Sequence, residues 1–157
     1  MPTDVLENFG STTALTITLG SLASSTTSVG RQTTEVDNTT TKAPRAFISA
    51  KITLGTSPTA NTAVYFWGIR NDNAGTAVRD DGAGASDAAW TRKSAKLIGV
   101  LYTGASPSTG DVLTGVFVMD NPGKKFAVGV THNTGVALNS TGSNHVLAYH
   151  LDNPQAQ

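Results

Sequence analysis

Three aspartates, Asp80, Asp81 and Asp87, form the densest group of potential metal ligands in the sequence. Calcium binds carboxylate and carbonyl oxygens supplied by flexible loops, so these three side chains are the candidates for a metal site. Their spacing matches no known calcium-binding loop, and Asp-Gly is also an ordinary turn sequence. We therefore expect a turn here, with metal binding as the alternative.

Two histidines, His132 and His145, are a second potential pair of metal ligands. If the segment 134–143 closes a hairpin, His132 faces His145 across two neighbouring strands. A protein zinc site needs at least a third ligand, and the sequence places no evident one beside them. The two histidines are therefore expected to be hydrogen-bonded structural residues.

The remaining polar residues do not match a catalytic pattern. Glycoside hydrolysis needs two carboxylates held across a cleft, whereas these aspartates share one glycine-rich loop. Ser106 lies in a Gly-Ala-Ser-Pro turn and not in a Gly-x-Ser-x-Gly elbow. Gly82 and Gly84 precede no helix that could bind phosphate. We expect no catalytic residue, no cofactor and no enzymatic activity.

The elements that carry these residues are predicted to be β-strands. Residues 46–54 are apolar at every even position, and the odd positions after Phe47 are polar, which is typical of a half-buried strand. Turns containing proline or glycine separate the strands, and no stretch of ten residues has a helical stripe. The prediction is an all-β fold, an antiparallel β-sandwich with jelly-roll-like topology and about seven or eight strands. The other predicted strands are residues 15–19, 29–36, 64–70, 97–102, 112–119, 126–133 and 144–151.

The proposed hairpin also predicts which side chains share a face. One face is apolar and is expected to point to the core. The opposite face carries small, uncharged side chains, so it lies either against another subunit or beneath other parts of the same domain. The core-facing set is Phe126, Val128, Val130, His132, His145, Leu147, Tyr149 and Leu151, and the opposite set is Ala127, Gly129, Thr131, Val146, Ala148 and His150.

Composition limits the kinds of partner. Charged residues make up 14% of the 157 residues, and 11 basic residues balance 11 acidic ones, so no net charge attracts nucleic acid or an anionic membrane. The chain has no cysteine, which excludes disulfides and thiol chemistry. The first residues lack the basic and apolar segments of a signal peptide, so we expect synthesis in the cytoplasm of a host cell.

The length fits a single domain spanning residues 1–157, with an N-terminal arm at 1–13, a long loop at 71–96 and a tail at 152–157. Apolar residues in irregular, polar segments are candidates for contacts with a partner, and Val5, Leu6, Phe9 and Trp90 fit this description. The alternatives are that Phe9 packs on its own subunit and that Trp90 covers the core of the sandwich.

Several segments of the chain resemble small structural proteins of tailed-bacteriophage virions. These segments are residues 15–23, 30–39, 79–89 and 126–138. They are distributed from residue 15 to residue 138, so the likeness spans most of the chain. Their motifs are turn and strand sequences and not catalytic signatures. The resemblance implies a β-sandwich subunit of a virion, of the decoration or cement kind.

From this resemblance we expect a protein on the outer surface of the capsid that binds the major capsid protein and forms a homo-oligomer, with a trimer favoured. Two alternatives remain. One is a structural component of the tail or neck. The other is a carbohydrate- or receptor-binding module of a tail or fibre, in which Tyr65, Trp67 and Trp90 would stack on sugar rings.

Overall fold

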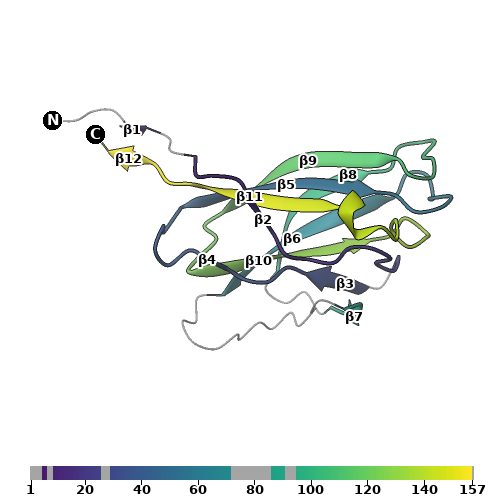
Figure 1. The fold of residues 1–157 in the computed structure, drawn as a ribbon, viewed down its shortest axis with the longest axis horizontal. Coiled ribbons are helices and arrows are strands. Elements are labelled where there is room, and N and C mark those ends of the chain that lie inside the picture. The colour runs from purple at the N-terminus through teal and green to yellow at the C-terminus, as the bar shows by residue number, and fades with distance from the viewer. Residues whose placement is uncertain (1–4, 7–8, 26–28, 72–85, 91–94, 157) are drawn as a thin grey trace.

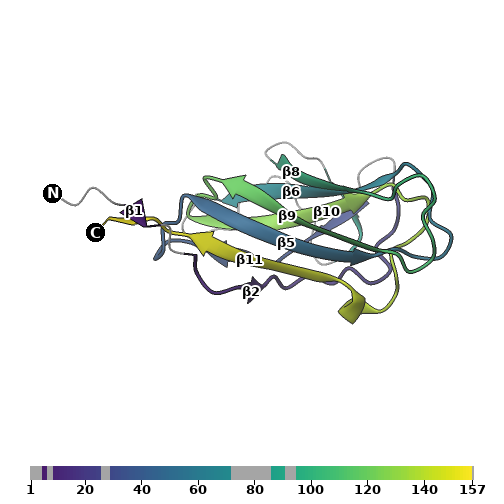
Figure 2. The same cartoon turned by 90° about the horizontal axis from the view of Figure 1, so that it is seen from above.

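Two antiparallel β-sheets pack face to face around a hydrophobic core (Figures 1 and 2). The structure, a computed structural model, describes residues 5–6, 9–25, 29–71, 86–90 and 95–156. Its elements are strands and one short 3₁₀ helix, η1 (Gly142–Asn144). The all-β sandwich predicted from the sequence is confirmed.

The two sheets contain six and four strands, which is more than the seven or eight predicted. The six-stranded sheet has the order β7 (Ala88–Ala89), β3 (Val29–Gln32), β10 (Lys125–His132), β6 (Ala63–Asn71) and β8 (Lys96–Tyr102), with β4 (Val36–Asp37) also paired to β10. The four-stranded sheet has the order β2 (Thr13–Ala14), β11 (Val146–Asp152), β5 (Arg45–Thr53) and β9 (Val112–Asp120).

The strand pairs are nested along the chain. The innermost pair is β6 with β8, followed outward by β5 with β9, β3 with β10, and β2 with β11. Successive pairs alternate between the two sheets, so the first half of the chain and the second half wrap together around the core. This nested order is the jelly-roll topology expected from the sequence.

The position of the core explains why apolar and polar residues alternate along β5. Ile48 and Ile52 are fully buried between the sheets, whereas Lys51 points to solvent. Aromatic rings from both sheets meet in the middle. The Phe126 and Tyr149 rings cross edge to face with centroids 5.7 Å apart, which is a favourable geometry for aromatic pairs.

The hairpin predicted for residues 126–151 is wrong. β10 belongs to the six-stranded sheet and β11 to the four-stranded sheet, so the intervening segment crosses from one sheet to the other. The predicted faces are nevertheless largely right, since Phe126 and Val130 are buried and Leu147 faces them from the opposite sheet. Alternation determines which face a residue occupies, but it does not choose the neighbouring strand.

Two other predicted strands differ from the structure. Residues 15–19 form no ladder, because their backbone hydrogen bonds go to two different segments. Leu15 N donates to Leu147 O of β11, whereas Thr16 O accepts from Thr34 N, between β3 and β4. The segment 29–36 is interrupted, so that β3 and β4 pair separately with β10.

The two chain ends form a ribbon that projects from the sandwich (Figure 1). β1 (Val5–Leu6) and β12 (Gln155–Ala156) pair antiparallel, with Val5 opposite Ala156. The expected N-terminal arm and C-terminal tail are therefore joined in one feature. Among the described residues, no helix has the length and apolar character needed to cross a membrane.

Candidate functional site

Of the three candidate metal ligands, the structure describes Asp87. Asp87 forms an ion pair with Arg31, whose Nε lies 2.5 Å from Asp87 Oδ1, and also accepts a bond from Ala23 N. Asp80 and Asp81 lie outside the described residues. No group of three acidic, histidine or cysteine side chains suited to a metal occurs in the described ranges.

The two histidines hold loops in place. His132 is buried, with Nε2 2.9 Å from Leu22 O and Nδ1 2.9 Å from the Thr134 hydroxyl. His145 Nε2 lies 2.8 Å from Asn139 O, and its Nδ1 accepts from Thr53 N. Both nitrogens of each ring therefore have partners within the protein, which agrees with the structural role expected for them.

Burial lowers the pKa of both His132 and His145 below their usual value of 6.5. Below about pH 6.5 the unfolded chain binds protons that the folded chain does not, so we expect stability to fall as the pH decreases from 6.5 towards the lowered pKa values. Urea unfolding between pH 5 and 7.5 measures this slope. The double variant His132→Gln/His145→Gln should show a shallower slope, and an unchanged slope would contradict the assignment.

Trp90 is buried, with 3% of its surface exposed. Its indole lies on the outer face of the six-stranded sheet, where glycines leave room for it: a Cβ at Gly129 would overlap the ring, and one at Gly30 would lie 3.2 Å from it. Ile69 and Ala127 complete this small second core. This finding corrects the expectation that Trp90 is an exposed contact residue, and the alternative of a covering residue is closer to its position.

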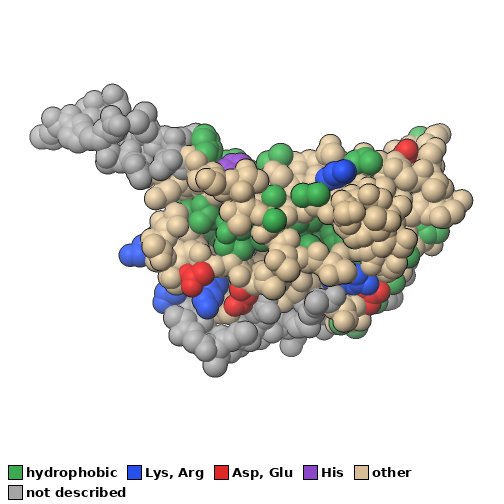
Figure 3. Space-filling model, in the orientation of Figure 1, with side chains coloured by type: hydrophobic (Ala, Val, Ile, Leu, Met, Phe, Trp, Pro, Cys, Tyr) green, Lys and Arg blue, Asp and Glu red, His purple; other side chains and the backbone are tan. Residues whose placement is uncertain are grey.

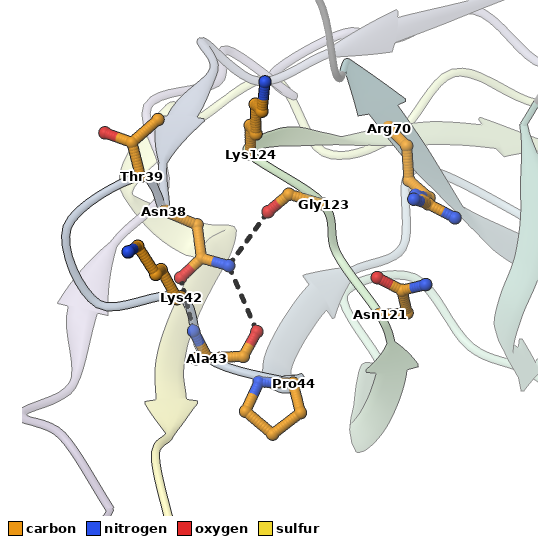
Figure 4. A pocket seen from close by; sticks show the side chains of 9 residues that line it. All are labelled: Asn38, Thr39, Lys42, Ala43, Pro44, Arg70, Asn121, Gly123 and Lys124. Atoms are coloured by element: carbon orange, nitrogen blue, oxygen red, sulfur yellow. Dashed lines mark hydrogen bonds between the residues drawn. The ribbon is translucent and has the colours of Figure 1, made fainter.

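A surface pocket of about 380 Å³ lies where β5 begins (Figure 4). The Asn38 side chain joins two segments of the pocket lining by hydrogen bonds. Its Nδ2 donates to Ala43 O and Gly123 O, and its Oδ1 accepts from Ala43 N. Lys42, Arg70 and Lys124 contribute cations to the lining, and no histidine or carboxylate is among the described lining residues. The lining therefore has no acid and base pair for proton transfer.

The outer face of the four-stranded sheet is the largest group of exposed apolar side chains in the described structure. We call it the apolar face and define it by Phe9, Phe47, Val116, Val118, Val146 and His150. In the register of this sheet, Phe47 lies between Val118 and His150, and Ser49 lies between Val116 and Ala148. Four members are strongly exposed: Val116 63%, Phe9 53%, Val146 47% and Val118 41%.

Aromatic rings form one end of the apolar face. Phe47 stacks on His150 with centroids 4.8 Å apart, and Phe9 contacts both rings edge to face at 5.8 and 5.7 Å. Phe9 was expected to contact either a partner or its own subunit, and it packs on its own sheet while remaining half exposed. The side chains of Val5 and Leu6 lie outside the described part of the chain.

In Figure 3, most acidic and basic side chains lie along the lower part of the view, whereas hydrophobic side chains, with a basic one among them, lie along the upper part. Along β5, Arg45 is at the aromatic end, where its Nη2 contacts Asp152 Oδ2 at 2.5 Å. Lys51 is two residues beyond Ser49 and lies opposite Val146 in the register. Between these two charges, the rows of Phe47 and Ser49 carry no charged side chain in the described structure. A surface of this kind suits contact with a protein better than contact with nucleic acid.

Sequence reasoning identified Phe9 as a contact candidate and placed Val146 and His150 on a neutral face that could lie against another subunit. It missed Phe47, Val116 and Val118. A usable signal was present, because Phe47 breaks the alternation of its strand and residues 112–119 contain no charged side chain. A comparison of the chain with models of protein families and with curated proteins found no match.

Proposed function

We propose that this protein is a bacteriophage capsid decoration protein that binds the major capsid protein on the outside of the head shell and stabilises the shell through protein contacts. The single observation that carries the proposal is the apolar face, whose rows around Phe47 and Ser49 carry no charge, since monomeric soluble proteins rarely expose a contiguous apolar surface without a binding role. The jelly-roll fold is compatible with this function, as it is with many others.

The mechanism is bridging. Each copy would bury its apolar face on the shell, so that expansion or rupture of the shell also requires these contacts to break. Aromatic residues are enriched among those that contribute most of the binding free energy of an interface, which gives Phe9 and Phe47 the leading role here. Binding to the assembled shell also stabilises the bound subunit by mass action.

Binding to shells that lack the protein tests the proposal. The variant Phe9→Asp introduces a carboxylate into the aromatic end of the apolar face, which β5 and β11 separate from the free edge of β9. Burial of an unpaired carboxylate is unfavourable, so we expect at least about tenfold weaker binding, equivalent to about 1.4 kcal/mol. Co-sedimentation of purified protein with the shells measures the affinity.

The matched control is Tyr102→Asp, which makes the same type of change at a residue 72% exposed on the other sheet. Its affinity should stay within about twofold of the unmodified protein. Equal losses for both variants, with unchanged unfolding curves, would contradict binding through the apolar face.

A second candidate function rests on the aromatic residues of β6 and β8. The Tyr65 and Trp67 rings lie 6.5 Å apart on the outer face of the six-stranded sheet, and the exposed Tyr102 follows on β8. Such a strip can stack on sugar rings, as expected for a tail or fibre module, although Trp90 is buried. Saturable binding to a host polysaccharide, lost in Tyr102→Ala, would favour this function. A tail or neck component, the third alternative, is distinguished by location in the particle.

A further inference from the structure

The strand β9 forms a long edge of the four-stranded sheet (Figure 1). Its nine residues pair with β5 on one side, and in the described structure no strand pairs with the other side. An unpaired edge of this length presents a row of backbone donors and acceptors to solvent. The chemistry of such an edge is specific, because only another extended backbone satisfies all of these groups.

The register shows which residues present these groups. Leu54 N donates to Asp111 O, and Asn121 N donates to Pro44 O, so hydrogen-bonded pairs with the β5 side fall on odd residues of this segment. The even residues of β9 therefore direct their backbone N–H and C=O groups outward. These residues are Val112, Thr114, Val116, Val118 and Asp120.

The edge of β9 lacks the features that prevent edge strands of monomeric proteins from pairing with another chain. From Val112 to Met119 it has no charge and no proline, and its ladder with β5 has no bulge. The other edges differ: β2 and β7 have two residues each, and β8 contains Lys96 and a register shift opposite Phe66 and Trp67.

We propose that β9 pairs antiparallel with β9 of a second copy of this chain, forming a two-fold dimer with one continuous eight-stranded sheet. A full-length pairing of two nine-residue strands places Val116 opposite itself on the two-fold axis, Thr114 opposite Val118, and Val112 opposite Asp120. All of these are even residues, so their outward backbone groups form the hydrogen-bonded pairs that the register requires.

The charges fit this pairing and disfavour the parallel one. Antiparallel pairing puts Asp120 beside the uncharged Val112 of the partner, whereas parallel pairing in register would place Asp120 next to Asp120 and oppose like charges. The dimer also joins two apolar faces into one surface, because Val116 and Val118 belong to both features. An isologous contact closes after two copies, so it predicts a dimer where the sequence favoured a trimer.

A pair of lysine variants tests both the interface and its register. Val116→Lys places two lysines opposite each other on the axis, and we expect at least about tenfold weaker dimerisation. Val112→Lys makes the same change at a similarly exposed position but faces Asp120 of the partner, so dimerisation should be unchanged or tighter. Sedimentation velocity over a concentration series measures both, with unfolding curves to check that each variant folds.

A cysteine variant gives a covalent measurement, because the chain has no native cysteine. Val116→Cys should form a disulfide-linked dimer under mild oxidation, since paired Cα atoms lie about 5.5 Å apart at such a position. Val146→Cys, exposed on β11, should not. A wild-type chain that remains monomeric at its highest soluble concentration would overturn the proposal, as would equal weakening by the two lysine variants. Neither result depends on whether the protein binds a capsid.

Discussion

Trp90→Ala is expected to destabilise the protein by about 3–5 kcal/mol, the usual cost of removing a buried tryptophan side chain. Trp90 is 97% buried on the outer face of the six-stranded sheet, where it contacts Ile69 and Ala127 and fills the space above Gly129. Its removal leaves a cavity that this sheet cannot close. Chemical denaturation followed by circular dichroism measures the change in the free energy of unfolding.

A double-mutant cycle identifies the packing partner. Gly129→Ala should destabilise the unmodified protein, because the new Cβ overlaps the Trp90 indole, but it should cost much less in the Trp90→Ala background. Tyr102→Ala, which removes an exposed aromatic side chain, should change stability by no more than about 0.5 kcal/mol. Additive effects of Trp90→Ala and Gly129→Ala would mean that the two residues do not contact each other.

Arg45→Ala is expected to cost about 3 kcal/mol, because it leaves a fully buried carboxylate without its cation. Asp152 has no exposed surface, and Arg45 is its ion-pair partner in the described structure. Removal of one member of a buried pair typically costs about 3–5 kcal/mol, and we take the lower end since the Arg45 side chain is 38% exposed. Urea unfolding at pH 7 measures the loss.

The second substitution in this pair provides the control. Asp152→Asn in the Arg45→Ala background removes the unpaired charge and should restore at least about 1 kcal/mol. A double variant less stable than Arg45→Ala would show that the penalty does not come from the buried carboxylate.

The fold class could be predicted from the sequence because alternation is a local property. Each residue of β5 shows in its own type whether it faces the core, as Ile48 and Lys51 do. The partner of each strand could not be predicted in this way. β10 and β11 follow one another in the chain, but they lie in opposite sheets because the nested jelly-roll order separates them.

The candidate surface was only partly predictable for a similar reason. Trp90 and Phe9 are both apolar residues in segments predicted to be irregular, so from the sequence both are candidates for contacts with a partner. The structure separates them, because glycines at positions 30 and 129 create space for the Trp90 ring, whereas Phe9 lies on the already crowded pair of Phe47 and His150. Such space arises only from strands that are distant in the chain.

The most direct test of the decoration proposal is to locate and count this protein on intact particles of the phage that encodes it, by cryo-electron microscopy with quantitative mass spectrometry. We predict many copies distributed over the outside of the head, with the apolar face directed at the shell. A few copies at the tail or neck, or none in the particle, would contradict it.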